Sequence, residues 1–76
     1  MASAQAELIA YIAKAIVDQP DLVKVRESDG GRLIELETAP EDRGRVIGRQ
    51  GRVAKAMRAL LGVTPDGADC RLDIVD

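Results

Sequence analysis

Two glycines three positions apart, Gly48 and Gly51, constrain the fold of this 76-residue chain more than any other feature. They enclose Arg49 and Gln50, and they lie between an apolar pair and a basic, helix-forming stretch. A backbone can approach a phosphate group closely where no side chain blocks it, and glycine provides that access. If a helix begins directly after the loop, its unpaired N–H groups and the positive end of its dipole point to the same place. The segment therefore predicts a turn between two helices that is suited to bind phosphate.

Positive charge is concentrated around this loop, although the chain as a whole is slightly acidic, with a formal net charge of −2 at pH 7. Residues 41–58 contain six cations and two acids, a sum of +4, so the remaining residues sum to −6. The six cations are Arg43, Arg45, Arg49, Arg52, Lys55 and Arg58. A run of charge is often only a solvated helix face, but cations clustered at a glycine loop favour a binding patch on an acidic body.

Composition excludes several kinds of site. The chain has no Phe or Trp, and Tyr11 is its single aromatic residue, so the core must be aliphatic and base stacking on an aromatic sheet is disfavoured. With no His and one cysteine, Cys70, we expect no disulfide, no metal and no catalytic site, and hence neither a cofactor nor an enzyme. No apolar run is long enough to span a membrane, and the first residues lack the features of a signal peptide. We therefore expect a cytoplasmic protein that does not bind membranes.

The spacing of apolar residues in the first half predicts a helix followed by a β-hairpin. Residues 3–18 carry an apolar stripe at helical spacing, with Ser3 as a suitable N-cap. Residues 22–28 and 32–38 alternate between apolar and charged side chains, as half-buried strands do. The turn residues 29–31, with the sequence Asp-Gly-Gly, tolerate positive φ and favour antiparallel pairing of the two strands.

The second half predicts two helices around the glycine loop and a final strand. We expect a short helix over 40–47, begun by proline and ended by glycine, and a second helix over 52–61. A turn at 64–67 then leads to a strand over 69–75. The apolar side of the second helix is expected to face the core and consists of Val53, Met57, Leu60 and Leu61. The inward face of the final strand is expected to consist of Cys70, Leu72 and Ile74.

This order, α-β-β-α-α-β, predicts an α+β fold. The apolar sides of three helices can cover one face of a three-stranded sheet, while the other face carries charge and meets water. A chain of 76 residues has room for one core, so we predict a single domain over residues 1–76.

The element order and the glycine loop resemble a type II KH domain, a module that clamps single-stranded nucleic acid with a GXXG loop. The stretch APEDRGRVIGRQGRVAKAMRALL, residues 39–61, resembles the KhpA family of small bacterial proteins with a single KH domain, and the flanking stretches AYIAKAIVDQPDLVKV and RLDIVD also fit. The resemblance implies that the GXXG loop is Gly48, Arg49, Gln50 and Gly51. It implies that an apolar groove is lined by Val46, Ile47 and Val53. It implies that affinity is tuned by Arg45, Arg52 and Lys55.

On this basis we expect the backbone N–H groups of residues 49–52 to meet phosphate oxygens and to hold about four nucleotides. Bases are expected to lie over Ile47, Val53 and the neighbouring strand. Because phosphate contacts position a strand without reading its sequence, we expect weak binding of low specificity by one copy.

The resemblance further implies RNA binding with RNA-chaperone or post-transcriptional regulatory activity. It also implies a homodimer, and a complex with a larger Jag-type partner that contains a KH domain. It links the family to cell-length control and peptidoglycan homeostasis, and so to cell shape and cell-wall biogenesis. One alternative stays open: a protein-interaction module that dimerises and docks the Jag-type partner, with RNA binding secondary. The acidic body and the aliphatic strands favour that alternative.

Overall fold

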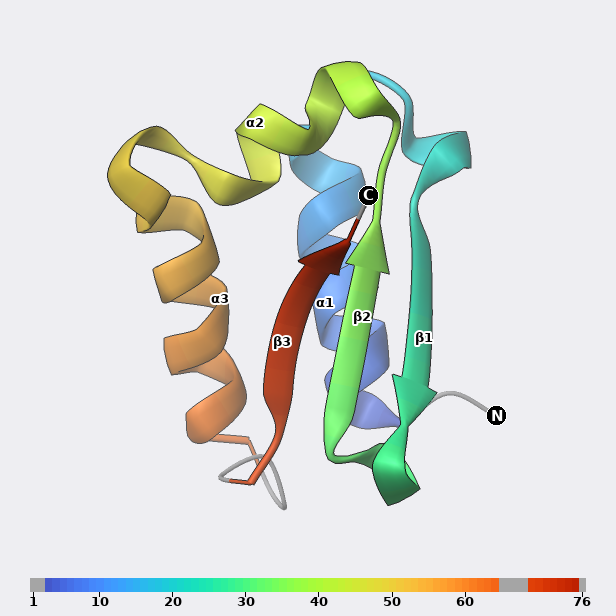
Figure 1. Ribbon diagram of the computed structural model, residues 1–76, viewed down its shortest axis with the longest axis vertical. Coiled ribbons are helices and arrows are strands. Elements are labelled where there is room, and N and C mark those ends of the chain that lie inside the picture. Colours follow the sequence, from blue (N-terminus) through green and yellow to red (C-terminus); the bar gives the residue numbers. More distant parts are fainter. Residues whose placement is uncertain (1–2, 65–68, 76) are drawn as a thin grey trace.

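The computed structural model describes residues 3–64 and 69–75 of the chain. The elements follow one another in the predicted order α-β-β-α-α-β, which confirms the α+β fold class (Figure 1). They are α1 (Ala4–Ile16), β1 (Lys24–Ser28), β2 (Leu33–Glu37), α2 (Arg43–Ile47), α3 (Arg52–Gly62) and β3 (Arg71–Val75). Short 3₁₀ turns precede β1, β2, α2 and α3. The turn predicted at 64–67 extends outside the described residues.

Helix α1 begins as predicted and ends two residues early. The Ser3 hydroxyl oxygen accepts a hydrogen bond from the Ala6 N–H at 3.1 Å, which confirms Ser3 as the N-cap. The helix stops at Ile16 because Val17 is extended, and the next two N–H groups, of Asp18 and Gln19, donate to a side chain of α2's entry turn instead of to helical carbonyls.

The sheet is mixed, with β2 at its centre. Strands β1 and β2 form the predicted antiparallel hairpin, in which Val25 lies opposite Leu36. Its turn, Asp29–Gly31, has positive φ at all three residues. Strand β3 pairs parallel to β2, with Ile74 opposite Leu36. Strand β1 begins later than predicted because Pro20–Leu22 form a 3₁₀ turn.

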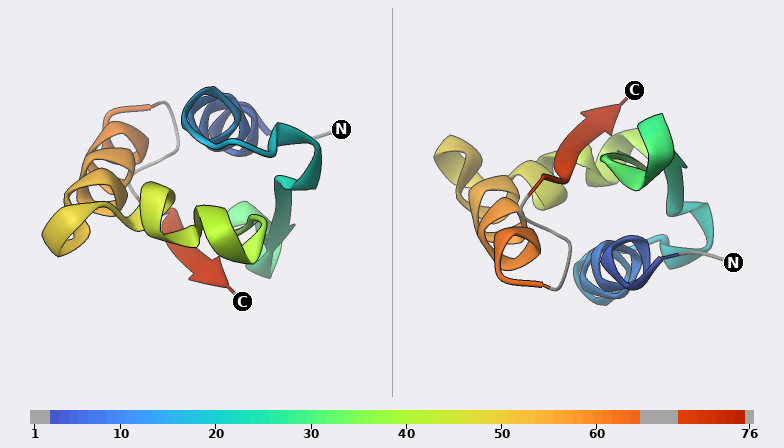
Figure 2. Two further views of the ribbon diagram at one scale, coloured as in Figure 1. Left: turned by 90° about the horizontal axis from the view of Figure 1, so that it is seen from above. Right: turned by 90° about the horizontal axis from the view of Figure 1, so that it is seen from below.

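All three helices contribute side chains to one core on the inward face of the sheet. In the end views α1 lies on one side of the sheet with α3 next to it, while α2 crosses the strand ends (Figure 2). The buried cluster consists of Ile9, Ala13, Val23, Ile34, Leu36, Val46, Met57, Leu61 and Leu72. Half-buried around it are Val25, Val53, Cys70 and Ile74, among others. The outward face is charged, and there Arg26 forms an exposed ion pair with Glu37 at 3.2 Å.

The prediction that Leu60 faces the core is wrong. Its side chain is 46% exposed, whereas Met57 and Leu61 are almost completely buried. Val53, Met57 and Leu61 are spaced four residues apart, so α3 packs along a narrow seam and Leu60 falls beyond its edge. Among the described residues, no helix has both the length and the apolar character needed to cross a membrane.

Candidate nucleic-acid interface

The loop between α2 and α3 has an unusual backbone. Helix α2 ends where the Gly48 N–H donates to the Gly44 carbonyl at 2.8 Å. Gly48 then takes φ 80° and ψ 167°, a region that is nearly exclusive to glycine. Gln50 and Gly51 are both left-handed, with φ of 57° and 75°, and α3 begins at the next residue. These conformations reverse the chain within four residues and leave the tip of the loop protruding from the body.

The two glycines are needed for different reasons. A Cβ on Gly48 would lie 2.5 Å from Cγ2 of Val53 and 2.7 Å from its backbone nitrogen, so the first turn of α3 packs directly on this residue. A Cβ on Gly51 would meet nothing within 4 Å. Gly51 is required by its positive φ alone, and its surface is open.

The loop offers fewer free backbone donors than predicted. The Gly51 N–H donates to the Gly48 carbonyl at 3.1 Å, and the Arg52 N–H donates to the Arg49 carbonyl. These two bonds close the 3₁₀ turn itself. Within the described part of the chain, the N–H groups of Arg49 and Gln50 have no such acceptor. Two of the four expected phosphate donors are therefore already engaged.

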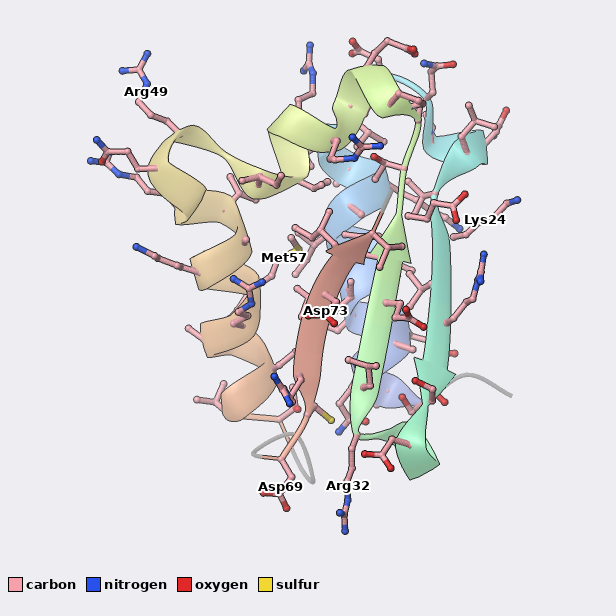
Figure 3. The ribbon with its side chains drawn as sticks, viewed as in Figure 1. Lys24, Arg32, Arg49, Met57, Asp69 and Asp73 are labelled. Atoms are coloured by element: carbon pink, nitrogen blue, oxygen red, sulfur yellow. The ribbon has the colours of Figure 1, made fainter. Side chains whose placement is uncertain are left out.

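Three exposed cations surround the loop. Arg49 projects from its tip, away from the rest of the molecule (Figure 3). Arg52 and Lys55 are exposed on the first turns of α3. Among the described residues, the Arg52 guanidinium makes a single long contact, 3.5 Å, with the side-chain oxygen of Gln50. None of the three forms an ion pair with an acid in the described residues. Their field is therefore directed to solvent and to any anion there.

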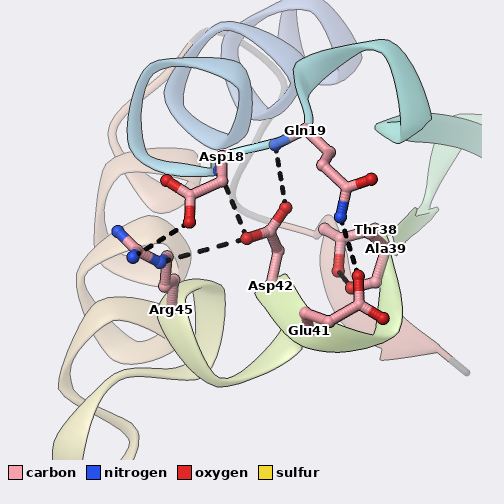
Figure 4. Close-up of polar contacts among 7 residues, drawn as sticks. All are labelled: Asp18, Gln19, Thr38, Ala39, Glu41, Asp42 and Arg45. Atoms are coloured by element: carbon pink, nitrogen blue, oxygen red, sulfur yellow. Dashed lines mark hydrogen bonds and ion pairs between the residues drawn. The ribbon is translucent and has the colours of Figure 1, made fainter.

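Arg45 does not join this group. Its Nη2 lies 3.1 Å from a carboxylate oxygen of Asp18, and its Nε lies 3.9 Å from Asp42 (Figure 4). The side chain is thus directed at the segment between α1 and β1 rather than at the glycine loop. The expectation that it tunes RNA affinity stays a prediction.

Of the three expected groove residues, two are at least partly accessible at the surface. Ile47, the last residue of α2, is 37% exposed, and Val53 is half-buried beside Gly48. Val46 is completely buried in the core, so the expectation that it lines the groove is wrong. Adjacent helical residues point about 100° apart, so one of the pair faces the core and the other faces solvent.

A polar anchor at the start of α2 was not predicted. The buried carboxylate of Asp42 accepts hydrogen bonds from the N–H groups of Asp18, at 3.2 Å, and Gln19, at 3.0 Å (Figure 4). Next to it the Gln19 amide donates to Glu41 at 2.7 Å. The sequence indicated only an acid in a first helical turn, because the partners are more than 20 positions away. This anchor holds the entrance of α2, and hence the loop, against the end of α1.

Within residues 3–64 and 69–75, no cluster of three or more His, Cys, Asp or Glu side chains is placed to hold a metal ion.

A three-stranded mixed sheet with this helix order, carrying a protruding GXXG loop between α2 and α3, defines the chain as a KH domain. A family model described as the KH domain of KhpA/KhpB matches residues 6–74, and the chain belongs to this family.

Relatives from several bacteria match nearly the whole chain. RNA-binding protein KhpA of Leifsonia xyli is 47% identical over 73 residues, which cover 93% of this chain and 96% of the relative. The protein of the same name from Treponema pallidum is 44% identical over 80 residues and covers both chains fully. That of Streptomyces coelicolor is 43% identical over 72 residues, 92% of this chain and 90% of the relative. No match was found among solved structures.

Proposed function

We propose that this protein binds single-stranded RNA through the loop Gly48–Gly51. Its membership of the KhpA/KhpB family and the names of its relatives support RNA as the ligand. The observation that carries the proposal is the combination of an open loop backbone with three cations that no acid of the described residues neutralises. An inert turn between helices has no need of such unpaired charge.

The loop supplies the phosphate contacts in this mechanism. The N–H groups of Arg49 and Gln50 donate to phosphate oxygens, and the guanidinium of Arg49 pairs with the same or a neighbouring phosphate. Arg52 and Lys55 extend the positive track along α3. The access left open at Gly51 lets the sugar-phosphate strand approach the backbone.

The apolar surface beside the loop supports the bases. Ile47 and Val53 present aliphatic side chains next to the phosphate track, and about four nucleotides fit a KH groove. In this proposal Val46 does not contact the bases; its buried side chain holds α2 in the core. Few polar groups face the bases, so affinity comes mostly from phosphate contacts and specificity is low.

Finer functions rest on the family resemblance. We propose that the protein is cytoplasmic, forms a single KH domain over 1–76, acts as an RNA chaperone or post-transcriptional regulator, and serves cell-length control and peptidoglycan homeostasis. A homodimer or a complex with a Jag-type KH partner would raise the avidity of a weak single site through effective concentration.

One observation favours the alternative function, a protein-interaction module. Leu60 and Val63, at the end of α3 far from the loop in sequence, are 46% and 81% exposed. An apolar pair of this kind suits contact with another protein chain. In this alternative the Jag-type partner or a second copy binds there, and RNA is secondary.

Fluorescence anisotropy with a labelled single-stranded RNA tests the proposal. The double variant Gly48→Asp and Gly51→Asp is expected to abolish binding. Because Gly48 has no space for a Cβ, that variant also strains the fold. A second double variant, Arg49→Asp and Gln50→Asp, keeps both glycines and is expected to abolish binding with unchanged circular dichroism.

The control for the Gly48/Gly51 variant places two Asp residues on α1 instead of in the loop. Ala4→Asp and Ala15→Asp, both exposed on α1, change the net charge by −2 as the glycine variant does, and RNA binding is expected to persist. Affinity should fall with rising salt, with a log–log slope that reflects a few phosphates. Unchanged affinity of the Arg49/Gln50 variant, or a flat salt response, would refute binding at the loop and favour the interaction module.

A further inference from the structure

Arg58, in the second half of α3, is exposed to solvent, but its guanidinium is hydrogen-bonded to the sheet. Its Nε and Nη2 both donate to the main-chain carbonyl of Leu72 in β3, at 3.2 and 3.1 Å. Arg58 therefore differs from Lys55, three residues earlier on the same helix, which has no hydrogen bond or ion pair among the described side chains. Two cations that look equivalent in the sequence therefore differ: among the described residues Arg58 has a hydrogen-bond partner and Lys55 has none.

The Leu72 carbonyl lies on the open edge of the sheet. In the described part of the chain, β3 pairs with one strand, β2, and the Arg71 N–H donates to that side, to the Arg32 carbonyl at 2.7 Å. In a parallel ladder successive residues direct their peptide groups to opposite sides. The N–H and carbonyl groups of Leu72 and Ile74 therefore face away from β2, toward α3, which lies next to this edge (Figure 1). Such an edge carbonyl is an acceptor that the amino or imino group of a base could use.

The Arg58 bridge crosses the seam between α3 and β3. On the loop side of the bridge lie Ile47, Val53 and Ile74, which are exposed or half-buried aliphatic side chains. At the bridge itself a cavity of about 360 Å³ is lined by Arg58, Cys70, Arg71, Leu72 and Asp73. The apolar surface that starts at the loop thus ends where the guanidinium spans from helix to strand.

We propose that Arg58 is a positioning residue that sets the length of the RNA site, an inference that rests on the proposed function. Its guanidinium occupies the Leu72 carbonyl at the seam, so along the described edge of β3 a strand held at the loop finds the main-chain carbonyl of Ile74 open but not that of Leu72. The two hydrogen bonds to the Leu72 carbonyl hold the guanidinium of Arg58 at the edge of the sheet, so in this proposal its positive charge stays there and does not pair with a phosphate held at the loop. The positive track ends at Lys55 even though the basic stretch of the sequence continues.

Two variants of similar shape test this inference: Arg58→Met, and Lys55→Met as the matched control. Each removes one positive charge from the same helix and keeps a long aliphatic stem. Binding is measured against salt and against oligonucleotide length. Lys55→Met should reduce the magnitude of the log–log salt slope by about 0.7, the value for one phosphate of a single strand. Arg58→Met should leave the slope unchanged, and should shift the shortest oligonucleotide that reaches full affinity to a greater length.

The outcomes separate the inference from the function on which it rests. Wild-type protein without RNA binding would overturn both. Wild-type binding, combined with an Arg58→Met slope reduced as much as that of Lys55→Met or with an unchanged length requirement, would overturn the inference alone. If Arg58→Met fails to fold, Arg58→Lys keeps the charge and replaces two donors by a single ammonium. That variant should also lengthen the required oligonucleotide at an unchanged slope, and a wild-type length requirement would count against the bridge.

Discussion

The two ends of the five-residue helix α2 use polar groups in opposite ways. At its start, the buried carboxylate of Asp42 is satisfied by two main-chain N–H groups from the segment after α1, and Arg45 lies beside it. At its other end, Gly48 begins a loop whose cations have no acid partner among the described residues. One end is held by the protein and the other is free to hold a ligand.

The difference teaches that a basic stretch is not a binding site throughout its length. Arg45 and Arg58 bond to groups of the protein, although both belong to the same run of cations as Arg49, Arg52 and Lys55. The proposed RNA track is the subset that packing leaves unpaired. The same packing fixes the start of α2, because the Asp42 carboxylate bonds it to the segment after α1.

The anchor provides the strongest test of this contrast. Asp42→Ala removes the acceptor of two partly buried N–H groups and should lower the free energy of unfolding by about 3 kcal/mol. Urea denaturation measures it. Glu41→Ala, at the exposed neighbour that accepts only from the Gln19 side chain, should cost less than about 1 kcal/mol. Equal losses for the two variants would mean that Asp42 is not the anchor.

The glycines at the free end give the next largest effect. Gly48→Ala should lower the free energy of unfolding by about 2 kcal/mol, because the new Cβ meets Val53 and the backbone lies in a region reserved for glycine. Gly51→Ala should lower it by about 1 kcal/mol, because only its positive φ opposes the side chain. Urea denaturation of both variants checks the order, and a larger loss at Gly51 would contradict the packing described for Gly48.

At Gln50 we expect a smaller change in the free energy of unfolding, and one of opposite sign. It is a non-glycine residue at φ 57°, so Gln50→Gly should raise the free energy of unfolding by up to about 1 kcal/mol. Arg49→Gly, at a neighbour with ordinary φ, should lower it, because glycine adds only unfolded-state freedom there. Thermal melts of the two variants distinguish these signs. Destabilisation by Gln50→Gly would show that the side chain contributes more than its backbone strain costs.

The smallest effect is expected at Glu27, an exposed carboxylate that, like Asp42, accepts a hydrogen bond from a main-chain N–H. Hydrogen bonds from Ser3, first from its side chain and then from its backbone N–H, lower the pKa of Glu27. A lowered folded-state pKa stabilises the fold fully above the usual glutamate value near 4.3, and this contribution disappears as the pH falls through the folded-state pKa. Melting temperatures of wild type and Glu27→Gln should therefore differ slightly at pH 7 and converge at pH 3. A difference that persists at pH 3 would assign it to packing instead.

Local patterns in the sequence predicted most of the elements and the position of the loop. The N-cap at Ser3, the hairpin turn at Asp29–Gly31 and the glycine stop of α2 depend on φ preferences and on hydrogen bonds within a few residues. Such preferences can be predicted from residues that are close together in the sequence. The positive φ of Gly48 and Gly51 belongs to the same class, so the sequence alone predicts the position of the loop.

What local patterns could not supply were the partners of individual side chains. The burial of Val46, the exposure of Leu60 and the parallel pairing of β3 depend on how separate elements approach one another. A helical stripe indicates which direction is apolar, but the width of the contact depends on the neighbouring strand. The expectations for Val46 and Leu60 failed for this reason.

The sequence by itself determined an aliphatic α+β chain with a glycine turn between two helices and a surplus of positive charge around it, because periodicity, φ preference and charge are short-range properties. Only the tertiary structure decided which of those charges remain free. Arg58 meets a carbonyl 14 positions away, Arg45 meets an acid of another segment, and Arg49 meets none in the described chain. Such pairings exist only after the elements have packed, because the groups they join are brought together by the common core.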